Sequence, residues 1–299
     1  MMKSFQSILG GAAIAAFLAG SALAQDGGED GCIAVSDISD KDVKRNAAQL
    51  GPESGLCISD LDFEENGLTW QITVIDNSEQ PNGPTIYLLH DNEDSAFDAA
   101  LYSVRRYGGK LIAVETGNRR EFKGQDPNRN FGMTKNATAT CGAMRKRPAP
   151  LFTQFLMDLR NDRINFFLTL HNNANGHSGN GGGGGISAER TSQVMTGMMS
   201  DKSDMDEDDA VLLAGSKPFD QERRAKRAAE FFLDRGVNVI YEHVIPARND
   251  CSFSNYVVLN DLGEYFNIEA EHGHTSVQKA MLDMMMKFHR IRVRNKTVQ

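Results

Sequence analysis

The stretch Pro84-Thr85-Ile86-Tyr87-Leu88-Leu89-His90-Asp91-Asn92-Glu93 is the one around which the rest of the chain is organised. Its apolar run, Ile86 to Leu89, has the aromatic and β-branched content of a buried strand. The run ends at His90, and Glu93 follows after two polar residues, just before a predicted helix. A histidine at a strand end and a carboxylate one turn later can both reach one metal ion. They could equally serve as a strand-end cap and a solvated acid at a helix start.

A second apolar strand ends in a histidine in the same way. Ile164 to Leu170 is strongly apolar, and His171 follows it directly. In open α/β sheets, ligands gather at the carboxyl ends of the strands. Because two such histidines and Glu93 would meet at one edge of a sheet, the sequence favours a metal site over a purely structural role. Two His and one Glu are a known catalytic ligand set for Zn²⁺.

Predicted strands and helices alternate along the chain. The turn at Pro81 to Pro84 predicts that the strand after it pairs antiparallel with the strand before it. Strand, helix and strand in that order indicate a parallel crossover. The sequence therefore predicts an α/β fold, a single domain with a mixed, mostly parallel sheet flanked by helices on both faces. Strands are predicted over 68–75, 86–89, 111–114, 164–170, 237–241 and 265–271, and helices over 96–107, 150–160, 219–235 and from 275.

The first 24 residues have the pattern of a secretory signal peptide. Lys3 supplies the positive start, Ile8 to Leu18 a short apolar core, and Ala22-Leu23-Ala24 a small-x-small cleavage site. We expect a secreted or periplasmic protein of residues 25–299 that has no membrane association after cleavage. Loss of Lys3 changes the formal net charge from -8 to -9. An acidic chain without a long basic run argues against nucleic acid as a partner.

The four cysteines, none of them in a C-x-x-C pair, are predicted to form two disulfides because an exported chain meets an oxidising compartment. Four cysteines allow three pairings. We favour Cys32–Cys57, which would staple the N-terminal segment, together with Cys141–Cys251, which would join two long loops.

The loop after the strand at 111–114 carries two groups of polar and basic residues, Arg119-Arg120 and Asn128-Arg129. Functional loops are commonly held on rigid strand ends. The fork of a guanidinium group matches the two oxygens of a carboxylate, so the loop predicts recognition of a carboxylate. A solvated basic loop is the alternative.

A Gly-rich and acidic segment around 176–216 is predicted to be a flexible insert. It contains five consecutive glycines but not the Lys-Ser/Thr of a phosphate-binding loop, and an acidic run follows over 201–209. The last predicted strand, by contrast, carries two acidic residues that could take part in a reaction. Glu269 and Glu271 share one of its faces, and two carboxylates there are costly unless they are used or paired.

Taken together, these residues resemble the zinc carboxypeptidase superfamily, especially its branch of aspartoacylases and succinylglutamate desuccinylases. The match runs in chain order through H-D-N-E at 90–93, D-P-N-R-N-F at 126–131, L-H-N-N at 170–173 and E-x-G at 271–273. The resemblance implies a zinc carboxypeptidase-like domain over 25–299. It also implies that His90, Glu93 and His171 hold Zn²⁺ and that Asn128 and Arg129 clamp a substrate carboxylate.

Other roles implied by the resemblance have more than one candidate in this chain. The general base is Glu269 or Glu271, and we prefer Glu271 because the x-Gly after it matches the family pattern. The arginine that polarises the substrate carbonyl is Arg119 or Arg120. Tyr256 is a candidate for the family's tyrosine. The chain lacks room for the extra C-terminal β domain of aspartoacylases, so their substrate is not carried over.

Two functions of different classes follow. The first is a zinc-dependent hydrolase that cleaves an amide bond in a small peptide or N-acyl amino acid with a free carboxylate, using metal-activated water and a Glu base. Cell-wall peptides are a source that only the location suggests. The second is a non-catalytic periplasmic binding protein that retains the fold and the carboxylate clamp. A binding protein would not need both a Glu base and an open zinc position.

Overall fold

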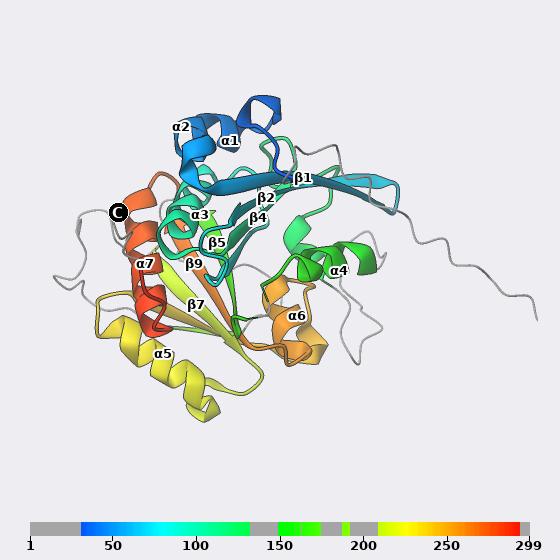
Figure 1. Ribbon diagram of the computed structural model, residues 1–299. Helices are drawn as coiled ribbons and strands as arrows, with labels where there is room; N and C mark the ends of the chain where they lie inside the picture. The colour runs from blue at the N-terminus through cyan, green and yellow to red at the C-terminus, as the bar shows by residue number, and fades with distance from the viewer. Residues whose placement is uncertain (1–30, 132–148, 162, 175–186, 192–208, 294–299) are drawn as a thin grey trace, which may run out of the picture.

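A nine-stranded sheet in the order β1-β2-β4-β3-β5-β9-β7-β8-β6 organises the chain (Figure 1). The computed structural model describes residues 31–131, 149–161, 163–174, 187–191 and 209–293. The strands are β1 (Leu56–Glu65), β2 (Leu68–Asn77), β3 (Thr85–Leu88), β4 (Lys110–Glu115), β5 (Phe166–Asn173), β6 (Ser187–Thr191), β7 (Ala210–Gly215), β8 (Asn238–His243) and β9 (Glu264–Glu271). The α-helices are α1 (Lys41–Arg45), α2 (Ala47–Leu50), α3 (Asp94–Tyr107), α4 (Pro150–Asp158), α5 (Arg223–Leu233), α6 (Phe253–Leu259) and α7 (Thr275–Phe288).

The predicted α/β architecture with a mixed sheet is confirmed. The central strands β4, β3, β5 and β9 are parallel to one another. Antiparallel partners are added on both sides, with β2 beside β4 and β7 beside β9, while β7 and β8 are again parallel. The parallel strands thus hold the centre of the sheet, where their carboxyl ends meet at one edge.

The predicted antiparallel pairing across the turn at Pro81 to Pro84 is wrong. β2 pairs with β1 and β4, whereas β3 pairs in parallel with β4 and β5. All four residues of β3 are buried. A strand buried on both faces fits the interior of a sheet better than a two-stranded hairpin, because each of its faces must be covered.

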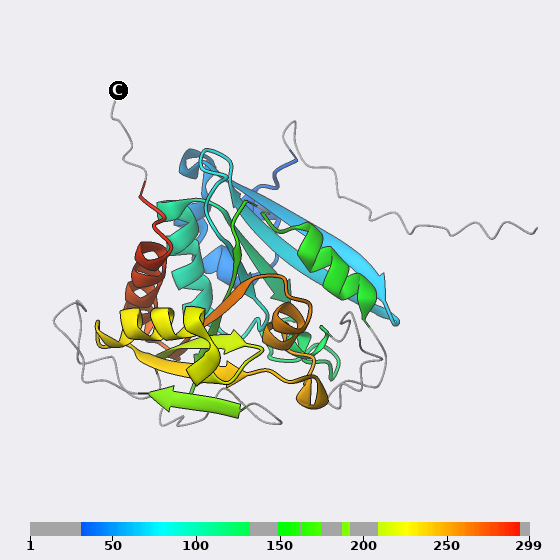
Figure 2. The ribbon, with the colours of Figure 1, turned by 90° about the horizontal axis from the view of Figure 1, so that it is seen from below.

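Helices cover both faces of the sheet, as predicted (Figures 1 and 2). One core cluster lies beneath α3, α5 and α7, and the other beneath α4 and α6. Successive side chains of a strand point to opposite faces. Ile86 and Leu88 therefore enter the first cluster, and Tyr87 and Leu89 enter the second. The apolar run from Ile86 to Leu89 therefore contributes to both core layers.

Part of the predicted flexible insert is a strand inside the sheet. β7 falls within 176–216 and pairs with both β8 and β9, and Asp209 before it is fully buried. Its apolar run, Ala210 to Ala214, is long enough for a buried strand, but the acidic residues before it led to the prediction of a flexible segment.

The predicted signal peptide lies outside the described residues. Within those residues, no helix is long and apolar enough to cross a membrane.

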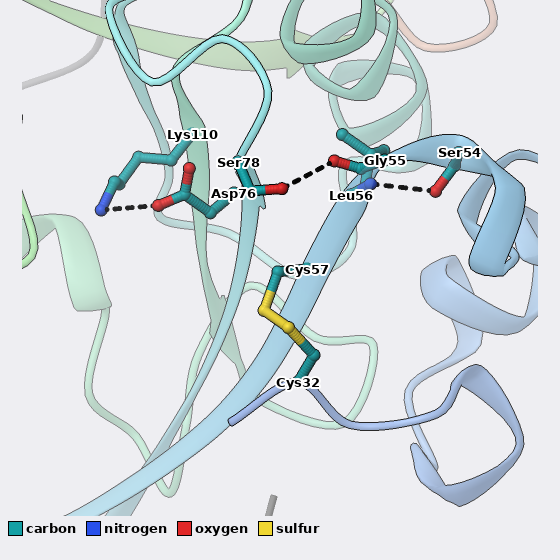
Figure 3. Close-up of a disulfide and its surroundings, with 8 residues drawn as sticks. All are labelled: Cys32, Ser54, Gly55, Leu56, Cys57, Asp76, Ser78 and Lys110. Carbon is teal, nitrogen blue, oxygen red and sulfur yellow. Dashed lines mark hydrogen bonds and ion pairs between the residues drawn. A yellow bond between two sulfur atoms is a disulfide. The ribbon is translucent and has the colours of Figure 1, made fainter. Parts of the chain in front are cut away.

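The predicted disulfide between Cys32 and Cys57 is confirmed (Figure 3). It joins the N-terminal segment to β1 across a sequence separation of 25 residues, with the two Cα atoms 5.1 Å apart. Next to it, the Ile33 N–H donates to the carbonyl of Ile58. Cys251 is also disulfide-bonded, and its predicted pairing with Cys141 lies outside the described residues.

Replacing Cys32 and Cys57 together by serine should lower the free energy of unfolding by about 3 kcal/mol, because closing a 25-residue loop removes entropy from the unfolded chain. Urea denaturation of oxidised protein measures this difference, and the disulfide of Cys251 remains in both forms. A loss below about 1 kcal/mol would show that the bridge adds little to stability.

Candidate metal centre and adjoining cavity

Three predicted ligands meet where two neighbouring parallel strands end. His90 lies just beyond β3, Glu93 directly precedes α3, and His171 lies in the last part of β5. β3 and β5 pair in parallel, so their carboxyl ends lie side by side. The short turn between β3 and α3 then folds Glu93 back onto both histidines.

The ligand atoms of these residues converge. The Glu93 Oε1 atom lies 2.9 Å from His90 Nδ1, and its Oε2 atom lies 2.9 Å from His171 Nδ1. The two Nδ1 atoms are 3.1 Å apart. Each of the three residues is at most 5 % exposed. Two ring nitrogens and a carboxylate therefore face one buried point, an arrangement that could hold a divalent metal ion.

Asp126, which sequence reasoning did not single out, fixes the orientation of His90. Its Oδ1 atom lies 2.9 Å from His90 Nε2. A carboxylate that accepts the proton at Nε2 leaves the lone pair at Nδ1, on the side of the other ligands. Asp126 is the first residue of the D-P-N-R-N-F motif, so its position close to Asn128 and Arg129 in the sequence could have identified it as a site residue. The residues present fit a zinc ion.

The charges of the cluster support one another despite burial. Burial disfavours charge on His90, but Glu93 and Asp126 outweigh it and raise the pKa of the ring from 6.5 to about 9. Burial likewise opposes charge on Glu93, yet His171 and His90 lower its pKa to about 2. A metal that binds here must displace the proton of His90, so its affinity should fall as the pH falls.

A second group of acids, Asp40, Asp42 and Asp91, also brings its oxygens within 4.8 Å of one another. These carboxylates already have structural partners. Asp40 caps α1, Asp42 pairs with Arg45, and Asp91 accepts N–H groups of the loop after β4. The group of two histidines and Glu93 is therefore the candidate metal centre.

The three ligands line a cavity of about 380 Å³. Its wall is mainly polar, and it receives residues from the loop after β4 and from β8 and β9. The residues of the wall that can carry chemistry are Arg120, Asn128, Arg129, Glu242, Asp250 and Glu269.

The structure separates the two candidate arginines. The Nη1 atom of Arg120 lies 3.4 Å from His90 Nδ1, and its Nη2 atom lies 3.3 Å from an oxygen of Asp126. Arg119 does not line the cavity, and its carbonyl accepts a hydrogen bond from the Thr116 hydroxyl. Arg120 is the guanidinium group that faces the metal centre.

The structure also places the two candidate bases differently, and only one of them lies at the cavity. Glu269 is level with His171 on the adjacent strand and lines the cavity. Glu271 shares the face of Glu269, but it lies at the end of β9, where its carboxylate is 3.6 Å from His274. It is not among the residues of the cavity wall. The shared face was predicted, but it could not reveal how far along the strand the cavity extends.

Asn128 and Arg129 both line the cavity, from the short 3-10 helix Pro127–Arg129. The Arg129 side chain donates to the carbonyl of Asn128 at 2.8 Å and pairs with Asp250 at 3.4 Å. Tyr256 is not brought to the cavity. It lies on α6, where its ring packs 6.0 Å from that of Phe131.

Glu242 is the least expected member of the wall, with a side chain that is 1 % exposed. The Asn255 amide donates to its Oε1 atom at 2.6 Å. Burial raises the pKa of Glu242 from 4.5 to about 7. It stands in the last part of an apolar strand, as His171 does, and this pattern could have identified it.

No family model and no curated protein matches the chain. Solved structures do resemble it. The "putative metallopeptidase" of Shewanella amazonensis SB2B is 14% identical, with 83% of this chain and 92% of that chain covered and a TM-score of 0.47. A "putative metallopeptidase" of Shewanella baltica OS155 is 14% identical, over 83% and 88% of the two chains, with a TM-score of 0.44. The "putative carboxypeptidase A" of Shewanella denitrificans OS-217 is 10% identical, over 81% and 66%, with a TM-score of 0.40.

Purified protein should contain one divalent metal ion per chain, and His171→Ala should lose it, because a single histidine and Glu93 make an incomplete set. Elemental analysis measures the content. His272→Ala is the matched control, since His272 lines the cavity but lies outside the ligand group, and it should keep the metal. Full metal content in His171→Ala would contradict the assignment.

Proposed function

We propose that the protein is a zinc-dependent hydrolase of an amide bond in a peptide or N-acyl amino acid that bears a free carboxylate. The observation that carries this proposal is the convergence of His90, Glu93 and His171 at a cavity that also contains Glu269. Two histidines and a Glu suit zinc and leave a coordination position free. When bound there, zinc would lower the pKa of water to about 7 and polarise the substrate carbonyl.

Glu269 is the residue we assign as general base. Its carboxylate lies beside the metal centre, because Glu269 and His171 are paired neighbours on β9 and β5. The Asn267 amide donates to Glu269 Oε1 at 2.8 Å and so orients the group, which leaves Oε2 to face the water. The carboxylate takes a proton from the attacking water and then passes it to the leaving amine.

Arg120 supplies positive charge where the carbonyl oxygen becomes negative. Its guanidinium group is about half exposed, and it already faces the Glu93 carboxylate at 3.8 Å. A donor placed at a developing oxyanion stabilises the transition state by about 3 kcal/mol. Asp126, at 3.3 Å from Arg120, holds this side chain and His90 in one arrangement.

Arg129 and Asn128 are the residues we assign to the substrate carboxylate. The Asn128 Oδ1 atom is occupied by the N–H of Phe253 at 3.0 Å, so its NH₂ group is what it can offer a ligand. Arg129 can exchange Asp250 for the carboxylate of a substrate, or bind both. Fixing that carboxylate determines which amide bond reaches the metal centre.

We also propose that this reaction takes place outside the cytoplasm, in the periplasm or after secretion. The disulfide between Cys32 and Cys57 supports this location, because such bonds persist in oxidising compartments. Cell-wall peptides are then a source of substrate to include in a screen.

Glu269→Gln should keep its metal and lose activity by about 10²- to 10⁴-fold, because the amide retains the size of the side chain but cannot accept the proton. Glu271→Gln is the matched control and should lower the activity much less. Hydrolysis of a panel of N-acyl amino acids and small peptides measures both. The reverse result would reassign the base to Glu271, and full activity in both variants would refute the mechanism. Binding without turnover in the unaltered protein would favour the non-catalytic alternative.

Arg129→Ala should weaken both binding and turnover of a substrate with a free carboxylate. Amidation of that carboxylate should lower kcat/KM strongly in the unaltered protein and only slightly in the variant, because the guanidinium group and the carboxylate act as a pair. Comparing kcat/KM for the acid and the amide in both proteins tests the pairing. If amidation costs both proteins equally, Arg129 is not the partner of the carboxylate.

A further inference from the structure

We infer that the cavity selects a substrate residue whose side chain ends in a cation, an ammonium or guanidinium group, and that Glu242 binds this cation. The inference rests on the proposed function for the reaction at the metal centre. It concerns the far end of the same cavity.

Glu242 lies well away from the metal centre, across the face of the sheet. From β5, which carries His171, the order is β9, β7 and β8, so Glu242 is three strands distant. Adjacent strands are about 4.8 Å apart, so these two strands are about 14 Å apart. Glu242 also lies four residues beyond the level of His171 along the strands, about 13 Å, so the two Cα atoms are about 20 Å apart. The side chains of His171 and Glu242 both enter the cavity and shorten this span, and only a long substrate side chain can cover the rest.

The strand register places the residues between the metal centre and Glu242 on a single face of the sheet. Glu269 is level with His171, and Asn267 precedes Glu269 on that face, opposite Leu212 of β7. Glu242 is level with Ala214, which lies two residues beyond Leu212 on the same face of β7. Leu212 and Asn267 both line the cavity between the two ends. The stem of a long side chain would therefore lie over Leu212, with its tip at Glu242.

Glu242 has no basic partner among the residues that the structure describes. Its hydrogen-bond donors are neutral, the Asn255 amide and the Ser254 hydroxyl. The guanidinium group of Arg129 pairs with Asp250, and its positive charge offsets the burial of Glu242 only weakly. A buried carboxylate with so little compensating charge is costly, and its raised pKa expresses this cost. A cationic ligand would remove it.

A second polar group in the cavity also lacks a donor. Asn267 is 5 % exposed, and its Oδ1 atom is buried without a hydrogen-bond partner in the described part of the chain. Its amide nitrogen is engaged by Glu269, which fixes Oδ1 as an acceptor. Buried polar groups are nearly always paired. An ammonium group carries three N–H donors and a guanidinium group five, more than Glu242 alone requires.

The charge at this end of the cavity has the sign that a cation requires. Glu242 and Asp250 contribute two carboxylates, and Arg129 contributes one positive charge. A substrate with an apolar side chain would leave Glu242 and the Asn267 oxygen unsatisfied after excluding water from them. Such a mismatch costs about 10²-fold in affinity.

The test compares N-acyl-lysine with N-acyl-norleucine, which has the same carbon chain without the ammonium group. We expect kcat/KM to be about 10²-fold higher for the lysine compound, and Glu242→Gln to reduce that ratio to a few-fold. Glu242→Asp, which keeps the charge, should retain a clear preference for lysine. Glu222→Gln is the control, because this carboxylate lies outside the cavity wall, and it should leave the ratio unchanged.

A binding measurement separates this inference from the proposed function. Calorimetry with free L-lysine and L-norleucine needs no hydrolysis, and we expect lysine to bind more tightly and to lose that advantage in Glu242→Gln. If no substrate is hydrolysed but this pattern holds, the proposed function fails and the cation site stands. Equal binding and hydrolysis of the two compounds, or a lysine preference that survives in Glu242→Gln, would overturn the inference. If Glu242→Gln does not fold, Asn267→Ala takes its place. Loss of the lysine preference in that variant would support the inference, and an unchanged preference would overturn it.

Discussion

The approach of His90 to His171, with 3.1 Å between their Nδ1 atoms and Glu93 bridging both, is the contact on which the site depends. Both histidines come from parallel neighbours in the sheet. A slip of β3 by one residue would turn His90 to the opposite face and would exchange the two core layers that its side chains enter. Burial of all four residues of β3 makes such a slip costly. The packing of the core and the geometry of the ligands are therefore fixed by the same strand.

Asp126 extends this constraint to the loop that follows β4. One of its oxygens meets the His90 ring and also accepts the N–H of Asn128, while the other faces Arg120. A single carboxylate thus positions a proposed metal ligand, the Arg120 guanidinium group beside it and the segment that carries Arg129. The loop is held at its start by the hydrogen bonds of Thr116 and Asn118 to Asp91, and further along by this carboxylate.

Local patterns in the sequence were sufficient to predict that His90, Glu93 and His171 come together and to predict the layered architecture. The apolar runs before His90 and His171 predicted strands that end at one edge, and the observed register brings those residues together. Pairing was predicted less well, because the turn at Pro81 to Pro84 does not reveal that β4 will enter between β2 and β3. Glu269 and Glu271 were indistinguishable, since alternation gives both the same face. That Tyr256 lies outside the cavity wall could not be predicted either, because the packing of α6 against Phe131 depends on contacts distant in the sequence.

The bridge between Cys32 and Cys57 has a consequence beyond the entropy of a closed loop. β1 is the outermost strand on its side of the sheet, and a bare outer strand offers N–H and C=O groups to any second chain. The bridge holds the N-terminal segment along this strand, where the Ile33 N–H occupies the carbonyl of Ile58. Reduction of one pair of sulfur atoms would release the covalent tie that keeps this segment beside the outer strand, so the cover over that margin of the sheet depends on the redox environment of the chain.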